Sequence, residues 1–437
     1  MKLKTLIATI CIVLLVPLFG GITLAANLIP ITNWNLKEVY SVDYGEGEKA
    51  EYTLDDIIQS YKNSGSKYRK IELEYQLNDL NLMRLDEELS AQNANQEKYR
   101  QLINQNEALI ESYEREMETL TEGSEEWMAV ATSMDACSMN LSMYQAYLSD
   151  SAALKADVYA RLEDYRFIQT NKEQLRMQEQ KKQISELMER CHYLIVLNES
   201  YNLADSTVEY NNLVYQINKA NLNQGRATQI DVDYLDAELL VAKNERESVL
   251  SSYNNLYKHV LRNVNINENQ SAEIIVDVKN YRPKNIIKYS AAKSSFENND
   301  IKVKQLLNNI SIANGRIGIL DDVYEAESNI MKVENKNKEI AQAELDEWLL
   351  ERSISFDSLY ADYETKYDAV NIQEKKAEAQ HKKYTVARNK YNLGLISRIE
   401  LQEEELRVKK CELEAWKALY DYVRAFNAIE LAMLGVL

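Results

Sequence analysis

Two segments of the chain, residues 222–261 and 391–430, repeat one design. In each segment a glycine interrupts a long helical pattern, and a hydroxyl residue followed three positions later by a carboxylate restarts it. This spacing is that of a capping box, which begins a helix. The matched pairs are Gly225 and Gly394, Thr228 and Ser397, Ile230 and Ile399, Asp231 and Glu400, Val232 and Leu401, and Tyr253 and Tyr422. A repeat of this length indicates a fold built twice, from two helical hairpins with related tips.

Turn-forming residues are scarce in the rest of the chain. The 437 residues include 3 prolines and 11 glycines, while long stretches are rich in Glu, Lys, Gln, Leu, Ala and Asn. This composition is typical of extended helices and coiled coils. We therefore expect an all-α fold of long coiled-coil helical hairpins in two tandem repeats, with a seam between helices as its core.

The N-terminus has the layout of an export signal. Lys2 and Lys4 precede an apolar run that ends in small residues at Ala25 or Ala26, as in a secretory signal peptide over residues 1–26. The apolar run is also nearly long enough to span a bilayer uncleaved, so a retained N-terminal anchor is the alternative. Both alternatives predict export to the cell envelope.

Charge and cysteine content exclude several classes of protein. The formal net charge of −18 argues against nucleic-acid binding, which needs a basic surface. It suits a solvated envelope protein, or one that attracts cations. Beyond the leader the chain has Cys137, Cys191 and Cys411, an odd number without the short spacing of a disulfide framework or a metal site. Cys411 is interpreted as a small residue of a helical seam.

No motif points to catalysis. His192, His259 and His381 are scattered over helical segments without a second ligand at a useful spacing. Neither a Walker loop nor a dinucleotide fingerprint occurs in the sequence. We therefore expect a protein that is not an enzyme and that binds no cofactor and no metal.

The chain divides at its few breaks. The expected units are an extended arm over 27–52, a first helical repeat over 53–265 with its tip at Gly225, a connector over 266–285, and a second helical repeat over 286–437 with its tip at Gly394. Alternating β-branched residues over 272–278 predict a single short strand in the connector. Opposite the tips, Gly123 predicts one turn, and Gly315 with Gly318 the other.

The helices that return from the two tips carry matched seams. In the first repeat the seam alternates steps of four and three, the spacing of a coiled coil, through Leu235, Leu239, Ala242, Arg246, Val249, Tyr253, Leu256 and Val260. Smaller residues occupy the same positions in the second repeat, so its helices can pack more closely. The segments between turn and tip are longer in the first repeat, as if a helical hairpin had been inserted opposite the tip.

The two tips resemble those of the TolC-like outer-membrane efflux proteins. The resemblance rests on YNLGLISRIEL at 391–401 and QGRATQIDV at 224–232, and on YTLDDII at 52–58. It implies three chains in one helical tube, whose tips form an entrance where an adaptor protein and an inner-membrane pump dock. By this resemblance Gly225, Thr228, Gly394 and Ser397 belong to the docking tips.

The resemblance also implies a gate. The acidic residues that follow the second tip glycine line the constriction in the family, and on this chain they are Glu400 and Glu403, with Asp231 and Tyr234 at the matched positions of the first repeat. Converging carboxylates would attract cations and repel anions. The alternative for Asp231 and Glu400 is helix capping and compensation of the helix dipole, and the two roles are compatible.

One departure from the family restricts the prediction. Members insert two β-strands per repeat, which three chains close into a pore in the outer membrane, and these strands are expected near residues 85–165 and 315–335. The first window reads as helix, and the second is too short for two spanning strands. The main hypothesis is therefore a TolC-like conduit, in the outer membrane if the family role holds and otherwise membrane-associated outside the cytoplasm. The alternative is an exported coiled-coil scaffold with no transport activity.

Overall fold

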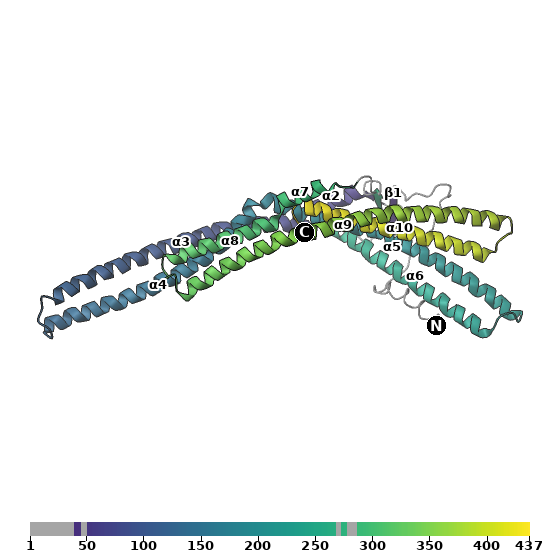
Figure 1. Ribbon diagram of the computed structural model, residues 1–437. Helices are drawn as coiled ribbons and strands as arrows, with labels where there is room; N and C mark the ends of the chain where they lie inside the picture. Colours follow the sequence, from purple (N-terminus) through teal and green to yellow (C-terminus); the bar gives the residue numbers. More distant parts are fainter. Residues whose placement is uncertain (1–38, 45–49, 268–271, 278–285) are drawn as a thin grey trace.

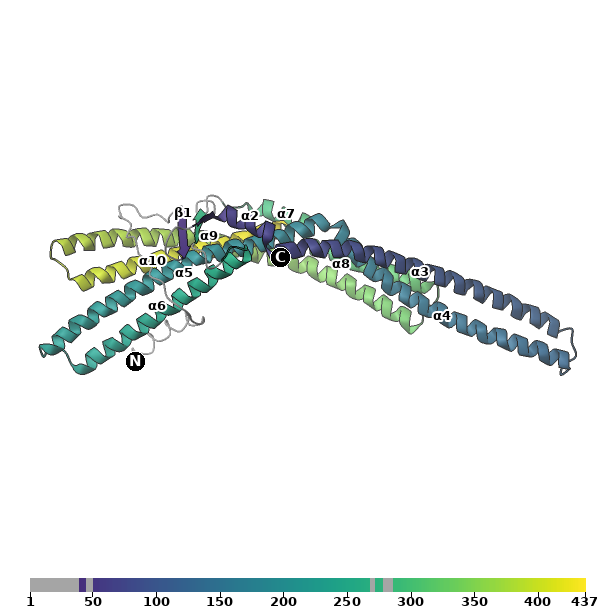
Figure 2. The same cartoon turned by 180° about the vertical axis from the view of Figure 1, so that it is seen from behind.

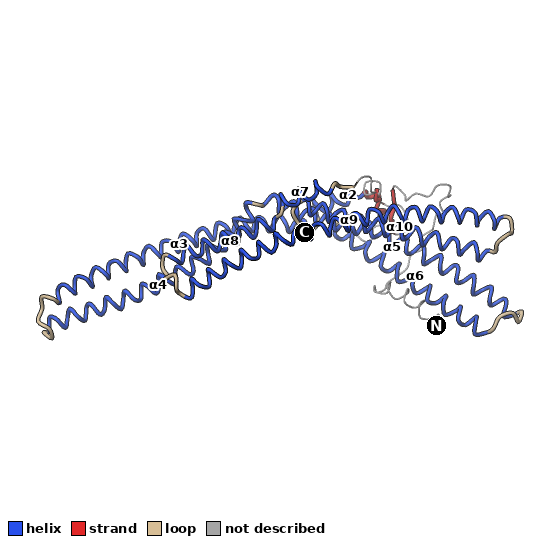
Figure 3. Tube along the Cα trace, in the orientation of Figure 1, coloured by secondary structure: helices blue, strands red, loops and turns tan. Residues whose placement is uncertain are grey.

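The computed structural model describes residues 39–44, 50–267, 272–277 and 286–437. The predicted signal peptide and the arm up to residue 38 lie outside the described residues. Long helices in hairpins make up most of the molecule (Figure 3), which confirms the predicted fold class. Among the described residues no helix is both long and apolar enough to cross a membrane.

Five helices form the first repeat. They are α2 (Leu54–Ser64), α3 (Ser66–Met117), α4 (Glu125–Thr170), α5 (Lys172–Asn223) and α6 (Gln229–Asn263). A capping box at Thr53 begins α2, because the Thr53 side chain accepts from the Asp56 amide while the Asp56 carboxylate accepts from the Thr53 amide. The predicted turn at Gly123 is present, with the glycine at φ +81°.

A break between α4 and α5 was not predicted from the sequence. Asn171 adopts φ −102° and ψ 13°, outside helical geometry, and its side-chain amide donates to the Phe167 carbonyl at 3.0 Å. The backbone hydrogen bonds continue across the break, from Asn171 to Phe167 and from Leu175 to Asn171. Asn171 therefore distorts a continuing helix, and no turn forms there.

Four helices form the second repeat. They are α7 (Tyr289–Asn299), α8 (Ile301–Asp321), α9 (Asn329–Asn392) and α10 (Arg398–Met433). The prediction of a turn at Gly315 and Gly318 was wrong, since both glycines lie within α8 and the turn spans 322–328. A Cβ on Gly315 would lie 2.2 Å from a ring carbon of Tyr159 on α4. This glycine therefore permits close packing of two helices.

The connector strand is part of a small sheet. Strand β3 (Ala272–Asp277) lies at the predicted position, between β1 (Val39–Tyr44) and β2 (Ala50–Thr53). It runs antiparallel to β1 and parallel to β2. The sequence predicted one strand beside an extended arm, whereas the structure pairs that strand with two strands of the arm.

Helices lie side by side in one layer toward each end of the molecule (Figures 1 and 2). At the tip end the order is α6, α5, α10, α9, and at the opposite end it is α3, α4, α8, α9. The two ends meet at a bend near the centre, and α3 and α4 extend beyond α8 and α9. Residues 85–165 and 315–335, where the resemblance places strands, form helices and turns. Within the described part of the chain, the two outermost helices of each layer have a helix neighbour on one side only.

The main core lies at the centre, where both repeats and the sheet meet. Its largest fully buried side chains include Tyr253, Tyr257, Tyr363, Phe296 and Phe356. Tyr257 donates to the Ala272 carbonyl of β3 at 2.8 Å, and Tyr360 donates to the Ile287 carbonyl at 2.6 Å. A tyrosine can bury its ring and still donate a hydrogen bond to a backbone carbonyl. These two hydrogen bonds therefore attach β3 and the start of the second repeat to the helices.

Candidate functional site: the two helical tips

Both tips end a helix with a glycine in the left-handed region. Gly225 has φ +68°, its amide donates to the Leu222 carbonyl at 2.9 Å, and the Arg226 amide donates to the Asn221 carbonyl at 2.8 Å. This hydrogen-bond pair is that of a Schellman motif, which satisfies the last carbonyls of a helix. The first tip is therefore a defined reversal of the chain.

The second tip repeats the same geometry. Gly394 has φ +72°, its amide donates to the Tyr391 carbonyl at 2.9 Å, and the Leu395 amide donates to the Lys390 carbonyl at 2.9 Å. A Cβ on either tip glycine would meet nothing within 4 Å. Glycine is therefore required by the backbone conformation and not by packing.

A capping box restarts the helix after each glycine, as predicted. The Thr228 hydroxyl accepts from the Asp231 amide at 3.2 Å, while the Asp231 carboxylate accepts from the Thr228 amide at 3.1 Å. Ser397 and Glu400 exchange the corresponding bonds at 3.2 and 2.7 Å. These hydrogen bonds from Thr228 and Ser397 lower the pKa of Asp231 and of Glu400. Both carboxylates are thus ionised helix caps that remain exposed to solvent.

Glu403 lies one turn further along α10, in the contact between the two tip hairpins. The Tyr210 hydroxyl of α5 donates to Glu403 at 3.0 Å, and Arg407 lies 3.7 Å from its other oxygen. Burial and this hydrogen bond raise the pKa of Tyr210. Glu403 therefore joins the first repeat to the second, in addition to the gate-lining role predicted from the resemblance.

An open groove of about 610 Å³ lies between α9 and α10 beside the second tip. Its lining comprises Lys382, Lys383, Val386, Ala387, Lys390, Ile396, Glu400, Glu403 and Glu404. The structure thus brings Glu400 and Glu403 together, while Asp231 lies on the other hairpin, and the two tips diverge (Figure 1). The lysines were not predicted, although their clustering in the last turns of α9 is visible in the sequence.

Large apolar side chains at the tips point to solvent. The exposed fraction is 79% for Ile230, 74% for Leu393 and 69% for Leu395. The two leucines flank Gly394, and Ile230 is in the first turn of α6. The sequence predicted tip roles for the glycines and capping residues, whereas no role was predicted for these apolar neighbours.

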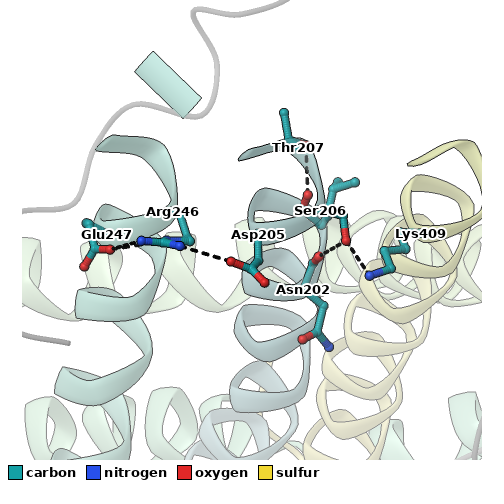
Figure 4. A network of polar contacts seen from close by, with 8 residues as sticks. Asn202, Asp205, Ser206, Thr207, Arg246, Glu247 and Lys409 are labelled. Atoms are coloured by element: carbon teal, nitrogen blue, oxygen red, sulfur yellow. Dashed lines mark hydrogen bonds and ion pairs between the residues drawn. The ribbon is translucent and has the colours of Figure 1, made fainter. Parts of the chain in front are cut away.

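Polar contacts tie three helices together below the tips (Figure 4). Arg246 of α6 binds Asp205 of α5 at 3.1 Å, and Lys409 of α10 donates to the Ser206 hydroxyl on the next residue of α5. The Ser206 hydroxyl in turn donates to the Asn202 carbonyl at 3.0 Å. The Arg246–Asp205 contact lies within the first hairpin, whereas the Lys409–Ser206 and Tyr210–Glu403 contacts cross between the two hairpins.

The histidines and cysteines lie apart from the tip glycines. Burial lowers the pKa of His192 to about 4, and His381 lies 2.8 Å from Glu412, between α9 and α10. Cys191 is fully buried, which raises its pKa to about 12. Cys137, Cys191 and Cys411 are free thiols. No group of His, Cys, Asp or Glu in the described ranges could hold a metal ion.

Solved structures similar to this chain include outer-membrane channels and another outer-membrane protein. The open-state MtrE channel of Neisseria gonorrhoeae is 11% identical, over 87% of this chain and 89% of that chain, with a TM-score of 0.46. VceC of Vibrio cholerae is 11% identical over 87% and 96%, with a TM-score of 0.42. The CmeC channel of Campylobacter jejuni is 14% identical over 66% and 68%, with a TM-score of 0.41.

No family model and no curated protein matches the sequence.

Proposed function

We propose that the chain is a subunit of a TolC-like conduit of the cell envelope, in which several copies close into a helical tube. The observation that carries this proposal is the layer of helices, which has an uncovered helix at each edge. The two repeats in this layer end in tips of the same geometry. Substrates would pass along the tube passively. An adaptor protein and an inner-membrane pump would bind at the tips.

The uncovered edges support closure by further copies. On α3, Leu73, Leu77 and Leu80 are 51%, 57% and 64% exposed, and on α9, Leu350 and Ile354 are 75% and 72% exposed. Apolar rows of this kind on a soluble surface mark contacts with other chains. Because α9 is an edge helix at both ends of the molecule, it would meet α6 and α3 of the next copy. A ring of three copies, the number that the resemblance implies, would leave no edge.

The tips support docking. Ile230, Leu393 and Leu395 project from rigid, capped turns, so a partner could bury them without first ordering the chain. Gly225, Thr228, Gly394 and Ser397 hold these turns in place and would act by positioning the apolar side chains. The adaptor would therefore contact a ring of paired apolar tips.

The contacts between the hairpins support a gate. Asp231, Glu400 and Glu403 would line the entrance in the assembled ring and favour cations over anions. Opening by outward movement of one hairpin would separate α5 from α10. The hydrogen bond between Tyr210 and Glu403 would break during this movement and thus favours the closed state.

One observation favours a different function. Residues 85–165 and 315–335 are helices and turns where the family inserts strands, as expected for an exported scaffold that conducts nothing. Native mass spectrometry of the full chain separates the two proposals. Detection of a closed ring would support the conduit, whereas detection of only a monomer or dimer would support the scaffold.

Conduction is tested in the cells that produce the protein. Deletion of the gene should raise sensitivity to a panel of toxic compounds, and the wild-type chain should restore resistance. Glu403→Lys should change resistance to charged compounds, and Tyr210→Phe should loosen the gate. Tyr215→Phe is the control, because Tyr215 contacts Lys219 of its own helix. If the Glu403→Lys variant assembles normally and resistance is unchanged, the proposed gate role is wrong.

A further inference from the structure

The far ends of α3 and α4, residues 101–148, form a two-helix unit that we call the distal hairpin. At its base the α8–α9 turn packs against both helices, where Arg100 binds Asp322 at 3.3 Å and the Tyr324 hydroxyl donates to the Ser149 carbonyl at 3.1 Å. Beyond this level the hairpin continues past the end of α8 and α9 (Figure 1). It therefore reaches a region where the second repeat supplies no neighbour.

One row of residues on α4 runs from the covered base to the uncovered end. Its positions alternate steps of four and three, so they share one face of the helix. At the base, Ala156 of this row is fully buried in a cluster with Leu320 of α8 and Met331 of α9. Further out the row continues through Met128, Thr132, Asp135, Met139, Ser142 and Ala146, all exposed.

The exposed part of this row carries two large apolar side chains among small and polar ones. Met128 is 52% exposed and Met139 is 75% exposed. The α4 residues that face α3, such as Met134 and Leu141, are less exposed and lie on the opposite side of the helix. The face that α8 covers at the base thus remains open to a further helix along the distal hairpin.

A second row lies on α3, on the face turned away from α4. In the distal hairpin it comprises Gln101, Gln105, Ala108, Ser112 and Arg115, again at steps of four and three and all exposed. It continues, with the same spacing, the row of Leu73, Leu77 and Leu80 nearer the centre. Among the described residues, no other helix therefore packs on this row of α3, which is continuous from the centre to the distal end.

Charge is distributed so that the two rows can meet. Asp135 is the single charge on the distal α4 row and Arg115 the single charge on the distal α3 row, and they are opposite in sign. Glu107 and Glu114 lie a quarter turn or more from the α3 row, and Glu111 lies 3.9 Å from Arg115 on the same helix. Glu107 and Glu114 would thus remain in water when the rows are covered.

We propose that the distal hairpins of neighbouring copies pack on one another, with the α4 row of one copy against the α3 row of the next. The inference rests on the ring assembly proposed above. In such a ring α8 and α9 separate α4 from the neighbour's α3 near the centre. Past residues 322–328 they are absent, so α4 and the neighbour's α3 become adjacent and the ring narrows into a bundle.

Cysteine cross-linking of the full chain tests this pairing. The background carries Cys137→Ser and Cys411→Ala, and Cys191 stays because it is buried and protonated. Met139→Cys combined with Ala108→Cys should give covalent oligomers with a short bis-maleimide. Met139→Cys combined with Glu107→Cys is the matched control and should remain monomeric on a denaturing gel, because Glu107 lies one residue away but on the flank. Equal cross-linking of both pairs, or of neither, would overturn the pairing.

A second cysteine pair keeps the two proposals distinguishable. Tyr234→Cys on α6 and Val386→Cys on α9 lie on the opposite edges of the tip layer, at similar distances from their tips, and are 63% and 53% exposed in the wild type. Cross-linking there without distal cross-linking would support the ring and overturn the inference. Cross-linking of the distal pair alone would support the pairing of hairpins and contradict the proposed ring. Circular dichroism checks that each variant is folded.

Discussion

At the scale of single residues, the tip glycines and the capping residues perform separate tasks. The glycine reverses the chain, since it adopts φ +68° or +72° without the steric cost that a Cβ brings. The hydroxyl and carboxylate then supply the missing partners of the new helix. The two tasks are repeated in both tips although few other residues are shared, which indicates that the tip shape itself is what the repeats have in common.

Replacing a tip glycine should loosen the tip without disturbing the core. In Gly225→Ala and Gly394→Ala the left-handed backbone costs about 1–2 kcal/mol, and no new contact offsets it. Hydrogen exchange of the tip amides should therefore accelerate roughly 5- to 30-fold. Gly225→Asn is the control, because asparagine tolerates this conformation, and it should exchange nearly as the wild type does. A Gly225→Ala tip as protected as the wild type would contradict the assignment.

A buried histidine predicts loss of stability in mild acid. The pKa of His192 is lowered by burial to about 4, whereas histidine in an unfolded chain titrates near pH 6.5. Between these values the unfolded state binds a proton that the folded state does not, so the free energy of unfolding falls as the pH falls, by roughly 3 kcal/mol at most. The melting temperature of the wild type should therefore decrease from pH 7 to pH 4.5.

His192→Gln should reduce this pH dependence, as followed by circular dichroism. His259→Gln serves as the control, because His259 is exposed on α6 and contacts Asn263 of its own helix. The control should keep most of the wild-type slope. If both variants retain the full slope, the acid sensitivity arises from other groups.

Residue-level features of the tips were predictable because they follow local rules. The two capping boxes and the reversal at Gly225 need only the neighbouring residues. The role of Gly315 needed a residue more than 150 positions away, Tyr159, and the sequence does not show which helix will lie against it. The same limit applies to Tyr210 and Glu403, whose hydrogen bond depends on how the two hairpins pack.

At the scale of elements, the two glycines of α8 form a natural pair for comparison. A Cβ on Gly315 would lie 2.2 Å from the Tyr159 ring, while a Cβ on Gly318 would meet nothing within 4 Å. Gly318→Ala should raise the free energy of unfolding by up to about 1 kcal/mol through helix propensity. Gly315→Ala should lower it by about 1 kcal/mol or more, since the ring must move off α8. Urea denaturation measures both.

A double-mutant cycle attributes this difference to one contact. In a Tyr159→Ala background the penalty of Gly315→Ala should disappear, and the substitution should resemble Gly318→Ala. A penalty that persists in this background would mean that Gly315 is constrained by the backbone of α8 and not by the neighbouring helix.

Element boundaries were predictable where a strong turn signal marks them. The ends of α3, α5 and α9 lie close to the predicted glycines, whereas the turn at 322–328 carries no glycine or proline and was missed. The break at Asn171 was missed for the same reason. The sheet was half predicted, since the alternation of β3 is visible in the sequence and the pairing with β1 and β2 is not.

At the scale of the whole molecule, helix breaks from both repeats lie together at the bend. Gln174, just after the break at Asn171, donates to the Asn299 carbonyl at 2.5 Å and accepts from Lys304 at 2.6 Å. Asp300 separates α7 from α8 at this level, where its buried carboxylate accepts from Trp348 at 3.0 Å. Two helix breaks from different repeats are thus joined, so the bend is a shared feature that directs the tips and the distal hairpin along different axes.

The exposed leucines of α3 predict how the molecule associates. Leu77 and Leu80 are more than half exposed in the single chain, so covering them in a ring should contribute about 1 kcal/mol each or somewhat more. Leu77→Asp combined with Leu80→Asp should therefore weaken association by roughly 30-fold or more. Sedimentation velocity over a concentration series measures this shift. Leu109→Asp is the matched control, because Leu109 is 45% exposed on the same helix but lies outside the row. If it weakens association as strongly as the pair does, α3 does not present a defined edge and the closed ring loses its main support.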